Sequence, residues 1–365
     1  MGADSVMTGL PGGVGRAAAL RNGTAKTLPV KVLLLAPEQR GPCGVLDYAL
    51  RLAAVLQESG VRVTIARGER KGRLSVCAVA AQARALKPDI VHVQYPMARY
   101  GSSLMPHWVA QLPRCRTVVT LHEFSRAHLL RRIAGLAFSR ADALVLTNAF
   151  ERAAFGRWYP WSRGRGHVIP IGSNIPWLSA QEPRDRDEVC YFGLIRPDKG
   201  LEPFLDLARL AADAVPQLRF RVLGAIPLGQ RAYCEQMRQA SGGLPRLIWD
   251  LGRSDGEVAQ RLAETGFLYL HYPDGASERR GTLLAALGNG AVVITSRGPQ
   301  TPPGLESVVR FAADPADALA QLGALRADPT AEANLRRAGR DWVKRHSWDA
   351  IAAAHLELYA RVAGR

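Results

Sequence analysis

The sequence predicts an α/β protein made of two doubly wound, Rossmann-like domains that face each other across a cleft. Short apolar runs rich in β-branched residues alternate with helix-length segments along most of the 365 residues. Apolar strands that are each followed by a helix are typical of a parallel sheet covered on both faces. The alternation stops at a polar stretch, 179–188, and then restarts. A chain of this length accommodates two domains of ordinary size.

The first domain is expected at 28–178. Its first strand is predicted at 30–36, and a helix at 45–58 because apolar residues recur there at helical spacing. These residues share one face of that helix: Leu46, Ala49, Leu50, Ala53 and Leu56. Further strands are predicted at 61–66, 89–94, 117–121 and 143–147. The preceding residues, 1–27, are rich in Gly and Ala and are predicted to be a disordered extension rather than a signal peptide.

The second domain is expected at 179–340, with 179–188 as the linker that leads into it. Its strands are predicted at 189–192, 220–223, 247–250, 267–271 and 291–295. Ser254 and Glu257 form a capping-box pattern that opens one of the intervening helices. The last segment, 341–365, contains an amphipathic helix and is expected to pack back toward the first domain.

Composition limits the classes of partner. The formal charge of +16 and the pI of about 10.2 fit a polyanionic partner, which could be nucleic acid, an anionic membrane or a phosphorylated substrate. The basic residues are scattered and form no known nucleic-acid-binding module, so nucleic acid is disfavoured. No apolar run approaches the roughly 20 residues that span a bilayer. The five cysteines are widely spaced, which favours reduced thiols in a cytoplasmic protein and predicts no metal site.

The segment 191–200 carries the most chemistry. A hydrophobic strand ends at Gly193, and two cations, Arg196 and Lys199, follow before a helix that begins near Leu201. A helix N-terminus supplies unpaired N–H donors and a partial positive charge. Cations placed beside it make a binding site for a phosphate group.

Several segments together resemble, in their order and spacing, the retaining glycosyltransferases of family 4, which have the GT-B fold. The resemblance covers roughly residue 30 to the C-terminus. It rests on a glycine-rich turn at 41–48, strand-end segments at 89–94 and 120–123, a segment leading out of the first domain at 168–174, the arginine–lysine motif at 192–200, a strand at 290–295 and a helix start at 346–348.

The resemblance implies transfer of a sugar from a nucleoside-diphosphate sugar to the hydroxyl of a saccharide, a lipid-linked saccharide or a small molecule, with retention of configuration. Arg196 and Lys199 would hold the leaving diphosphate, and His122 would contact the donor sugar. Preorganised cations stabilise charge that develops on a leaving group. No metal and no other cofactor is expected, because protein cations take the place of Mg²⁺.

The donor site is expected to include further residues at loop and helix ends. Gly44 would let backbone of the first domain approach the phosphates. Gly281 and Thr282 open a helix that offers another anion site, beside the cations Arg279 and Arg280. The complete set of predicted donor-binding residues is Gly44, Gly193, Arg196, Lys199, Ser277, Glu278, Arg280, Gly281 and Thr282.

One departure from the family pattern concerns a pair of glutamates eight positions apart, the first near the sugar hydroxyls and the second near the ribose. The alignment puts Ser277 and Ala285 in those places. Glu278 lies one residue away from the first and would need a loop shift to replace it. Nothing nearby replaces the second carboxylate, so ribose recognition is expected to differ.

The acceptor site is predicted less sharply, from Asp47, Tyr48, Trp158 and Trp161. Asp47 either caps its helix or faces the acceptor. The segment 157–165 combines aromatic rings with arginines. These rings could stack on sugars, could sit at an anionic bilayer surface at the inner face of the membrane, or could form an exposed turn over the first domain.

Three other interpretations remain open or are disfavoured. A hydrolase or epimerase of nucleotide sugars would use the same fold. The missing glutamates also leave open a non-catalytic GT-B-like binding or scaffold protein. An NAD-dependent dehydrogenase is disfavoured, because 37–44 has no Gly-x-Gly-x-x-Gly pattern after the first strand. The donor base, the sugar and the acceptor are not identified.

Overall fold

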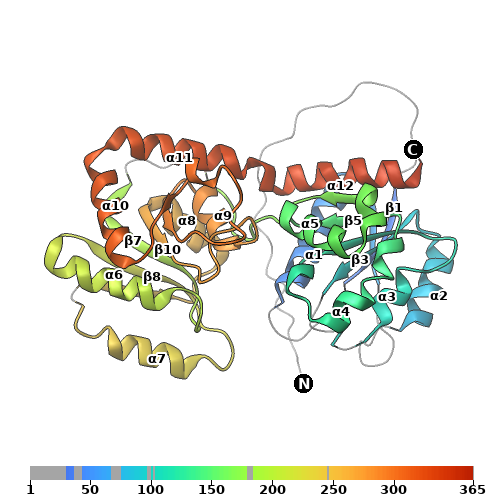
Figure 1. The fold of residues 1–365 in the computed structure, drawn as a ribbon, viewed down its shortest axis with the longest axis horizontal. Helices are drawn as coiled ribbons and strands as arrows, with labels where there is room; N and C mark the ends of the chain where they lie inside the picture. Colours follow the sequence, from blue (N-terminus) through green and yellow to red (C-terminus); the bar gives the residue numbers. More distant parts are fainter. Residues whose placement is uncertain are drawn as a thin grey trace, which may run out of the picture.

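The computed structural model describes residues 30–36, 43–66, 75–96, 100–101, 103–178, 184–244 and 246–364. The predicted N-terminal extension lies outside these residues. Figure 1 shows two α/β domains side by side, with the C-terminal helix of the chain lying across the first. Each domain contains a six-stranded sheet, and every pair of neighbouring strands in the two sheets is parallel. The predicted fold class is confirmed.

The first sheet has the strand order β2-β1-β3-β4-β5-β6. Its strands are β1 (Lys31–Leu35), β2 (Arg62–Ile65), β3 (Ile90–Tyr95), β4 (Arg116–Leu121), β5 (Ala143–Leu146) and β6 (Gly166–Val168). The helices are α1 (Gly44–Glu58), α2 (Val76–Leu86), α3 (Met105–Val109), α4 (Leu129–Ala134) and α5 (Ala149–Trp158). Short 3₁₀ turns lie at η3 (Phe124–Arg126), η4 (Phe138–Arg140) and η5 (Pro160–Arg165). The strand β6 has no apolar run of its own and is defined by its pairing with β5.

The second sheet has the strand order β12-β11-β10-β7-β8-β9. Its strands are β7 (Asp185–Leu194), β8 (Arg219–Ala225), β9 (Leu247–Leu251), β10 (Thr265–Leu270), β11 (Val292–Thr295) and β12 (Arg310–Phe311). The helices are α6 (Leu201–Ala214), α7 (Arg231–Ala240), α8 (Asp255–Glu264), α9 (Gly281–Gly288), α10 (Pro315–Ala327) and α11 (Pro329–Val343). A turn η6 (Leu305–Ser307) precedes β12. The capping box predicted at Ser254 is present at the start of α8.

The prediction of a linker at 179–188 is wrong in its second half, because β7 begins at Asp185. Residues 179–183 lie outside the described part of the chain. The polar side chains of this strand are matched by ion pairs: Arg219 binds Asp185, Arg326 binds Asp187, and Arg186 binds Glu332 at 2.8 Å. These ion pairs stabilise the start of a strand that lacks an apolar run. Because strands were predicted from apolar runs, this part of β7 was missed.

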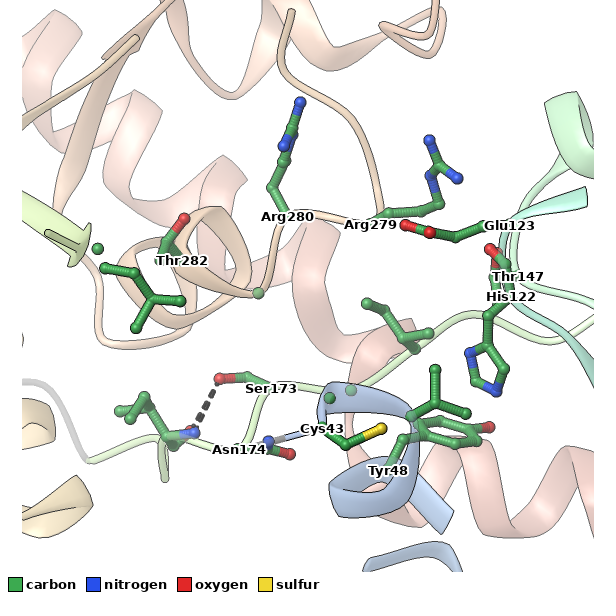
Figure 2. Close-up of a pocket in the computed structure, with 18 of the residues that line it drawn as sticks. Cys43, Tyr48, His122, Glu123, Thr147, Ser173, Asn174, Arg279, Arg280 and Thr282 are labelled. Carbon is green, nitrogen blue, oxygen red and sulfur yellow. Dashed lines mark hydrogen bonds between the residues drawn. The ribbon is translucent and has the colours of Figure 1, made fainter. Parts of the chain in front are cut away.

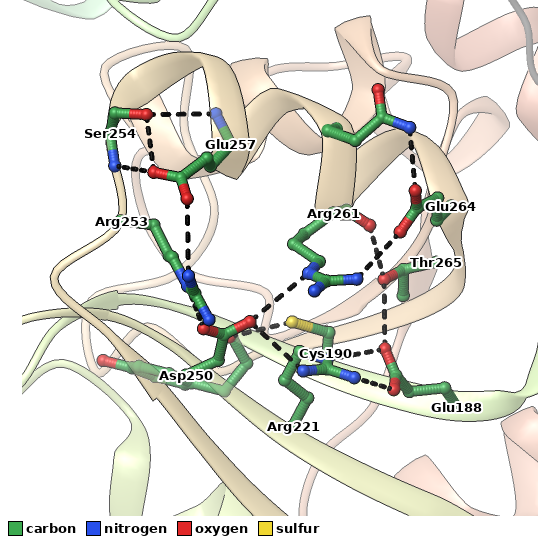
Figure 3. Close-up of polar contacts among 12 residues, drawn as sticks. Glu188, Cys190, Arg221, Asp250, Arg253, Ser254, Glu257, Arg261, Glu264 and Thr265 are labelled. Atoms are coloured by element: carbon green, nitrogen blue, oxygen red, sulfur yellow. Dashed lines mark hydrogen bonds and ion pairs between the residues drawn. The ribbon is translucent and has the colours of Figure 1, made fainter.

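Figure 3 shows a polar network of the second domain, between its sheet and α8. Arg221 of β8 makes a two-pronged contact with Glu188 of β7, at 3.0 and 2.8 Å. Asp250 of β9 accepts contacts from Arg221, Arg253 and Arg261. The carboxyl side chain of Asp250 is 3% exposed. Because Arg261 lies on α8, this network ties the helix to the sheet.

The C-terminal segment returns to the first domain. After α11 and the turn η7 (Lys344–His346), helix α12 (Trp348–Ala363) crosses above the first sheet (Figure 1). Four of its side chains belong to the core of the first domain: Ile351, Ala352, Leu358 and Tyr359. Among the described residues, no helix is both long and apolar enough to cross a membrane.

Candidate functional site

A cavity of about 720 Å³ lies between the two domains (Figure 2). The first domain contributes the N-terminus of α1 and the residues that follow β3, β4 and β5. The second contributes the end of β7, the end of β10 and the N-terminus of α9. Ligands of open parallel sheets bind in crevices outside the carboxyl ends of the strands. Here the carboxyl ends of both sheets meet at one cavity.

Two helices point uncapped N-termini at this cavity. Neither Cys43, which precedes α1, nor Arg280, which precedes α9, makes a side-chain capping hydrogen bond. A Cβ added to Gly44 or to Gly281 would meet no atom within 4 Å. Steric crowding therefore does not explain why these two positions are glycine. The open space lets an anion reach the backbone N–H groups at both helix ends.

Lys199 lines the cavity, and Arg196 lies beside it in the turn between β7 and α6. Neither side chain has a hydrogen-bond or ion-pair partner in the part of the chain that the structure describes. Burial, followed by the charges of Arg196, Arg280 and Arg126, lowers the pKa of Lys199. Arg196 does not itself line the cavity. The uncompensated positive charge at this position favours an anionic ligand.

The turn that carries these cations is held against the end of β10. Gly200 has φ +81°, and a Cβ there would lie 2.0 Å from the carbonyl oxygen of His271. Only glycine satisfies both the left-handed backbone and this close approach. Lys199 is thereby fixed next to the segment that leads from β10 to α9.

Arg280 and Thr282 belong to that segment and line the cavity. The guanidinium of Arg280 binds Asp274 and lies 4.6 Å from the ring centre of Tyr272. The Tyr272 hydroxyl and Thr282 Oγ1 are 2.8 Å apart, and burial raises the pKa of Tyr272 to about 12. Arg280 is therefore already paired, unlike Lys199.

Arg279 was predicted as a further cation beside the phosphate site, but its charge is compensated. It donates to Glu151 of α5 at 2.8 Å and to Gln300. Glu151 is fully buried and also accepts hydrogen bonds from the backbone and the side chain of Ser125, at 2.8 and 2.6 Å. The ion pair joins the two domains at the rim of the cavity. A second interdomain pair, between Arg126 and Asp274, spans 2.5 Å.

His122 follows the last residue of β4 and lines the cavity from the first domain, close to Tyr48 (Figure 2). Its Nε2 lies 2.9 Å from Oε1 of Gln94, an acceptor, so the ring proton is on Nε2. The Nδ1 atom is left as an acceptor with no partner among the described residues. Burial, together with the nearby His355, lowers the pKa of His122 to about 3, so the ring is neutral at physiological pH.

Of the remaining predicted residues, Tyr48 and Gly193 line the cavity, whereas Ser277, Glu278 and Asp47 do not. Ser277 is buried, and Glu278 is paired with Arg345 at 2.8 Å. Burial raises the pKa of Glu278. Asp47 is exposed on α1 and is not the capping residue, so the capping interpretation is wrong. Partial burial of its carboxyl group, with the charge of Asp255 of the second domain, raises the pKa of Asp47.

The two predicted acceptor tryptophans lie on the outer side of the first domain. Trp158 lines a separate cavity of about 420 Å³, with Arg132 5.7 Å from the centre of its ring. Trp161 is 60% exposed and donates to Ser139 at 3.1 Å. Neither lines the interdomain cavity.

Several lining residues were not predicted as site residues. Pro96, Glu123 and Thr147 each follow a strand of the first sheet within two residues, and Tyr272 does so after β10. The rule that ligands bind at carboxyl ends of strands would have found them. Arg131 comes from α4 and carries no such signal. Among the described residues, no group of three or more His, Cys, Asp or Glu side chains is arranged to hold a metal ion.

Two Rossmann-like domains with a cavity between them give the chain the GT-B fold. Residues 30–172 match the family model described as Glycosyl transferase 4-like domain. No curated protein matches the sequence.

Solved structures resemble the whole chain. The crystal structure of Anabaena Alr3699/HepE in complex with UDP has a TM-score of 0.71 and 16% identity, and the match covers 91% of this chain and 100% of that one. The same protein in complex with UDP-glucose gives a TM-score of 0.65 at 16% identity, over 91% and 99% of the two chains. A glycosyltransferase from Rickettsia africae ESF-5 gives 0.69 at 11% identity, over 92% and 99%. At these identities the similarity establishes the fold.

Proposed function

We propose that the protein is a retaining, metal-independent glycosyltransferase that moves a sugar from a nucleoside-diphosphate sugar to an acceptor hydroxyl. The observation that carries this proposal is Lys199, which has no partner among the described residues and lines the same cavity as the open N-termini of α1 and α9. Arg196 lies in the same turn as Lys199 and adds a second positive charge beside it. A diphosphate is the ligand that satisfies two cations and two helix ends at once.

The chemistry follows from where charge develops. When the glycosidic bond breaks, negative charge builds on the departing diphosphate. Lys199, Arg196 and the N–H groups at Gly44, Gly281 and Thr282 stabilise that charge, because they are positioned before the reaction begins. The acceptor hydroxyl attacks from the face that the diphosphate leaves, so no protein nucleophile is needed. The UDP and UDP-glucose complexes of a structural relative support a nucleotide sugar as donor.

His122 is proposed to bind the donor sugar. With its proton on Nε2, it offers Nδ1 as an acceptor and selects a sugar hydroxyl that donates a hydrogen bond. Tyr48, whose ring lies 5.0 Å from that of His122, forms the adjoining wall. The acceptor is proposed to be a saccharide or a lipid-linked saccharide.

The proposal predicts that Lys199→Ala lowers kcat by about 10²–10³-fold, the range seen when one preorganised group at a developing charge is removed. Lys344→Ala is the matched control, because Lys344 is exposed at the end of α11. The donor is first identified by thermal shift with UDP, GDP, ADP and TDP and their sugar conjugates, since a ligand of the folded state raises Tm. Full turnover by both Lys199→Ala and Arg196→Ala would contradict the assigned roles.

A second candidate is binding of a nucleotide sugar without glycosyl transfer. It is favoured by one observation: Ser277 and Ala285 stand where the family has glutamates, and both are buried. A thermal shift with no product, with or without an added acceptor, would support this candidate. A free sugar released without an acceptor would instead identify a hydrolase.

A further inference from the structure

Helix α4 exposes an apolar surface to solvent. None of its residues is buried. Its side chains Leu129, Leu130 and Ile133 are 61%, 73% and 53% exposed. A surface helix of a globular protein normally turns its apolar residues toward the core. Exposed apolar residues that gather in one place mark an interaction site.

Nearby elements also expose apolar residues, and hydrogen bonds link these elements to the residues that follow α4. Gln111, after α3, donates to the Ala137 carbonyl, after α4, at 2.6 Å. Trp161 of η5 donates to Ser139 of η4, and Arg165 donates to the carbonyl of the same residue at 2.7 Å. The exposed apolar residues of these linked elements, which we call the α3–α4 face, are Leu104, Trp108, Leu129, Leu130, Ile133, Leu136 and Trp161.

The domain that carries the α3–α4 face has a strongly basic sequence. Residues 30–178 contain 21 Lys and Arg but eight Asp and Glu, and so carry +13 of the formal charge of +16. Between residues 103 and 166 there are ten arginines and three acidic residues. Of these acids, Glu151 is buried against Arg279 and Asp142 is bound to Arg116. Most of the net positive charge of the chain therefore belongs to the first domain.

We propose that the α3–α4 face docks on the surface of an anionic lipid bilayer. Leu129, Leu130 and Ile133 enter the boundary between headgroups and acyl chains, and the surrounding arginines contact lipid phosphates. This combination of a projecting apolar helix, tryptophans and arginines is typical of proteins that lie on a membrane. A second copy of the chain fits less well, because it would bring two basic surfaces together.

Docking would place the candidate site at the bilayer. Arg131 lies on α4 and also lines the interdomain cavity. A smaller cavity, lined by Phe124, Ala127 and Phe138, shares Pro96, Glu123 and Arg131 with the interdomain cavity. An acceptor held in the membrane could therefore reach the cavity from the α4 side. This consequence for the acceptor rests on the proposed function, whereas the docking itself does not.

The test is co-sedimentation of the full-length protein with vesicles. Vesicles of phosphatidylcholine with roughly one third phosphatidylglycerol should bind the protein, and vesicles of phosphatidylcholine alone should not. Raising the salt from about 0.1 to about 0.5 M should weaken binding, since it shortens the screening length. Equal binding to both vesicles, or none to either, would overturn the proposal.

Two variants separate the apolar part from the charged part. Leu130→Glu/Ile133→Glu should reduce binding by at least about tenfold, because it removes buried apolar area and adds repulsion. The matched control Leu228→Glu/Ile248→Glu changes exposed apolar residues of the second domain and should bind as the wild type does. Arg140→Gln/Arg157→Gln should weaken binding and reduce its salt dependence, whereas Arg246→Gln should not.

The same variants distinguish a lipid bilayer from other partners that could bind the α3–α4 face. Circular dichroism checks that each variant is folded. Unchanged vesicle binding by Leu130→Glu/Ile133→Glu would refute the role of this face. A dimer in sedimentation velocity that this variant dissociates, with no vesicle binding by the wild type, would show an interface between copies instead. Binding to generic DNA that exceeds binding to anionic vesicles would identify the partner as nucleic acid.

Discussion

At the scale of single residues, His122 illustrates how neighbours fix the chemistry of a side chain. Gln94 accepts its Nε2 proton and is itself 3.2 Å from Nε2 of His92, with Gln94 as the donor. His92 Nδ1 in turn contacts the hydroxyl of Tyr359, on α12, at 2.7 Å. A buried chain of hydrogen bonds thus runs from the cavity to the C-terminal helix and sets the tautomer of His122.

Gln94→Glu should raise the pH below which the protein loses the proposed transferase activity. A carboxylate next to His122 favours its protonated form and raises its pKa from about 3. The protonated ring can no longer accept a hydrogen bond at Nδ1, so kcat/KM should fall by up to about tenfold near pH 5 and recover at higher pH. The measurement is the pH profile of kcat/KM.

Gln217→Glu, at an exposed position of the second domain, is the control for the added charge. A profile that coincides with that of the wild type would show that Gln94 does not govern the protonation of His122. Loss of activity that is equal at every pH would indicate a purely structural effect.

At the scale of secondary structure elements, the second domain depends on charge pairing across its sheet. Asp250 of β9 binds Arg221 of the neighbouring strand β8 and Arg261 of α8 (Figure 3). Burial raises the pKa of Asp250, but the hydrogen bond and charge of Arg253 and the charges of Arg221 and Arg261 outweigh it, so the pKa is lowered. This carboxylate stabilises the fold above its unfolded pKa and stops doing so as the pH falls through its folded pKa.

Asp250→Asn should destabilise the protein by about 2 kcal/mol, because an almost fully buried carboxylate loses its charge-assisted hydrogen bonds, although each arginine keeps another acidic partner. The control is Asp206→Asn, which breaks an exposed pair on α6 and should cost less than about 1 kcal/mol. Urea unfolding at neutral pH measures both. Equal effects of the two substitutions would show that the network adds nothing beyond ordinary surface pairing.

At the scale of the whole molecule, the two domains differ in how they respond to acid. Burial lowers the pKa of His107, His346 and His355 to about 4, and that of His122 to about 3. Three of these four side chains pack in the first domain, including His355 from α12. The unfolded chain binds protons near pH 6.5, whereas the folded chain binds them only at lower pH. Stability therefore falls as the pH drops from about 6.5 toward about 4.

The first domain should consequently unfold before the second on acidification. Each of these histidines should lower the free energy of unfolding by roughly 1–2 kcal/mol at pH 5 relative to pH 7. His355→Gln should reduce the loss of stability between these two pH values, and His128→Gln, at an exposed position, should not change it. Urea unfolding at pH 7 and pH 5 measures the difference. A loss that His355→Gln leaves unchanged would contradict this account.

Local sequence patterns predicted most of the strands. They did not predict the strands that are stabilised by contacts with other strands rather than by their own apolar residues. Apolar runs identified the central strands, while β6 and the polar start of β7 went unrecognised, because pairing and ion pairs stabilise them instead. In the site, the cations and glycines at helix starts were visible in the sequence. The pairing of Arg279 with Glu151 was not, since 128 residues separate the two.

The sequence by itself determined the two-domain α/β fold and the concentration of cations and glycines at the ends of strands, because periodicity and turn chemistry act over a few residues. Only the tertiary structure decided which of those cations remain unpaired. Lys199 has no partner among the described residues, while Arg279 and Arg280 are held by Glu151 and Asp274. It also decided that α4 turns its leucines to solvent. Ion pairing and burial depend on residues brought together from distant parts of the chain, and these contacts exist only once both domains have folded.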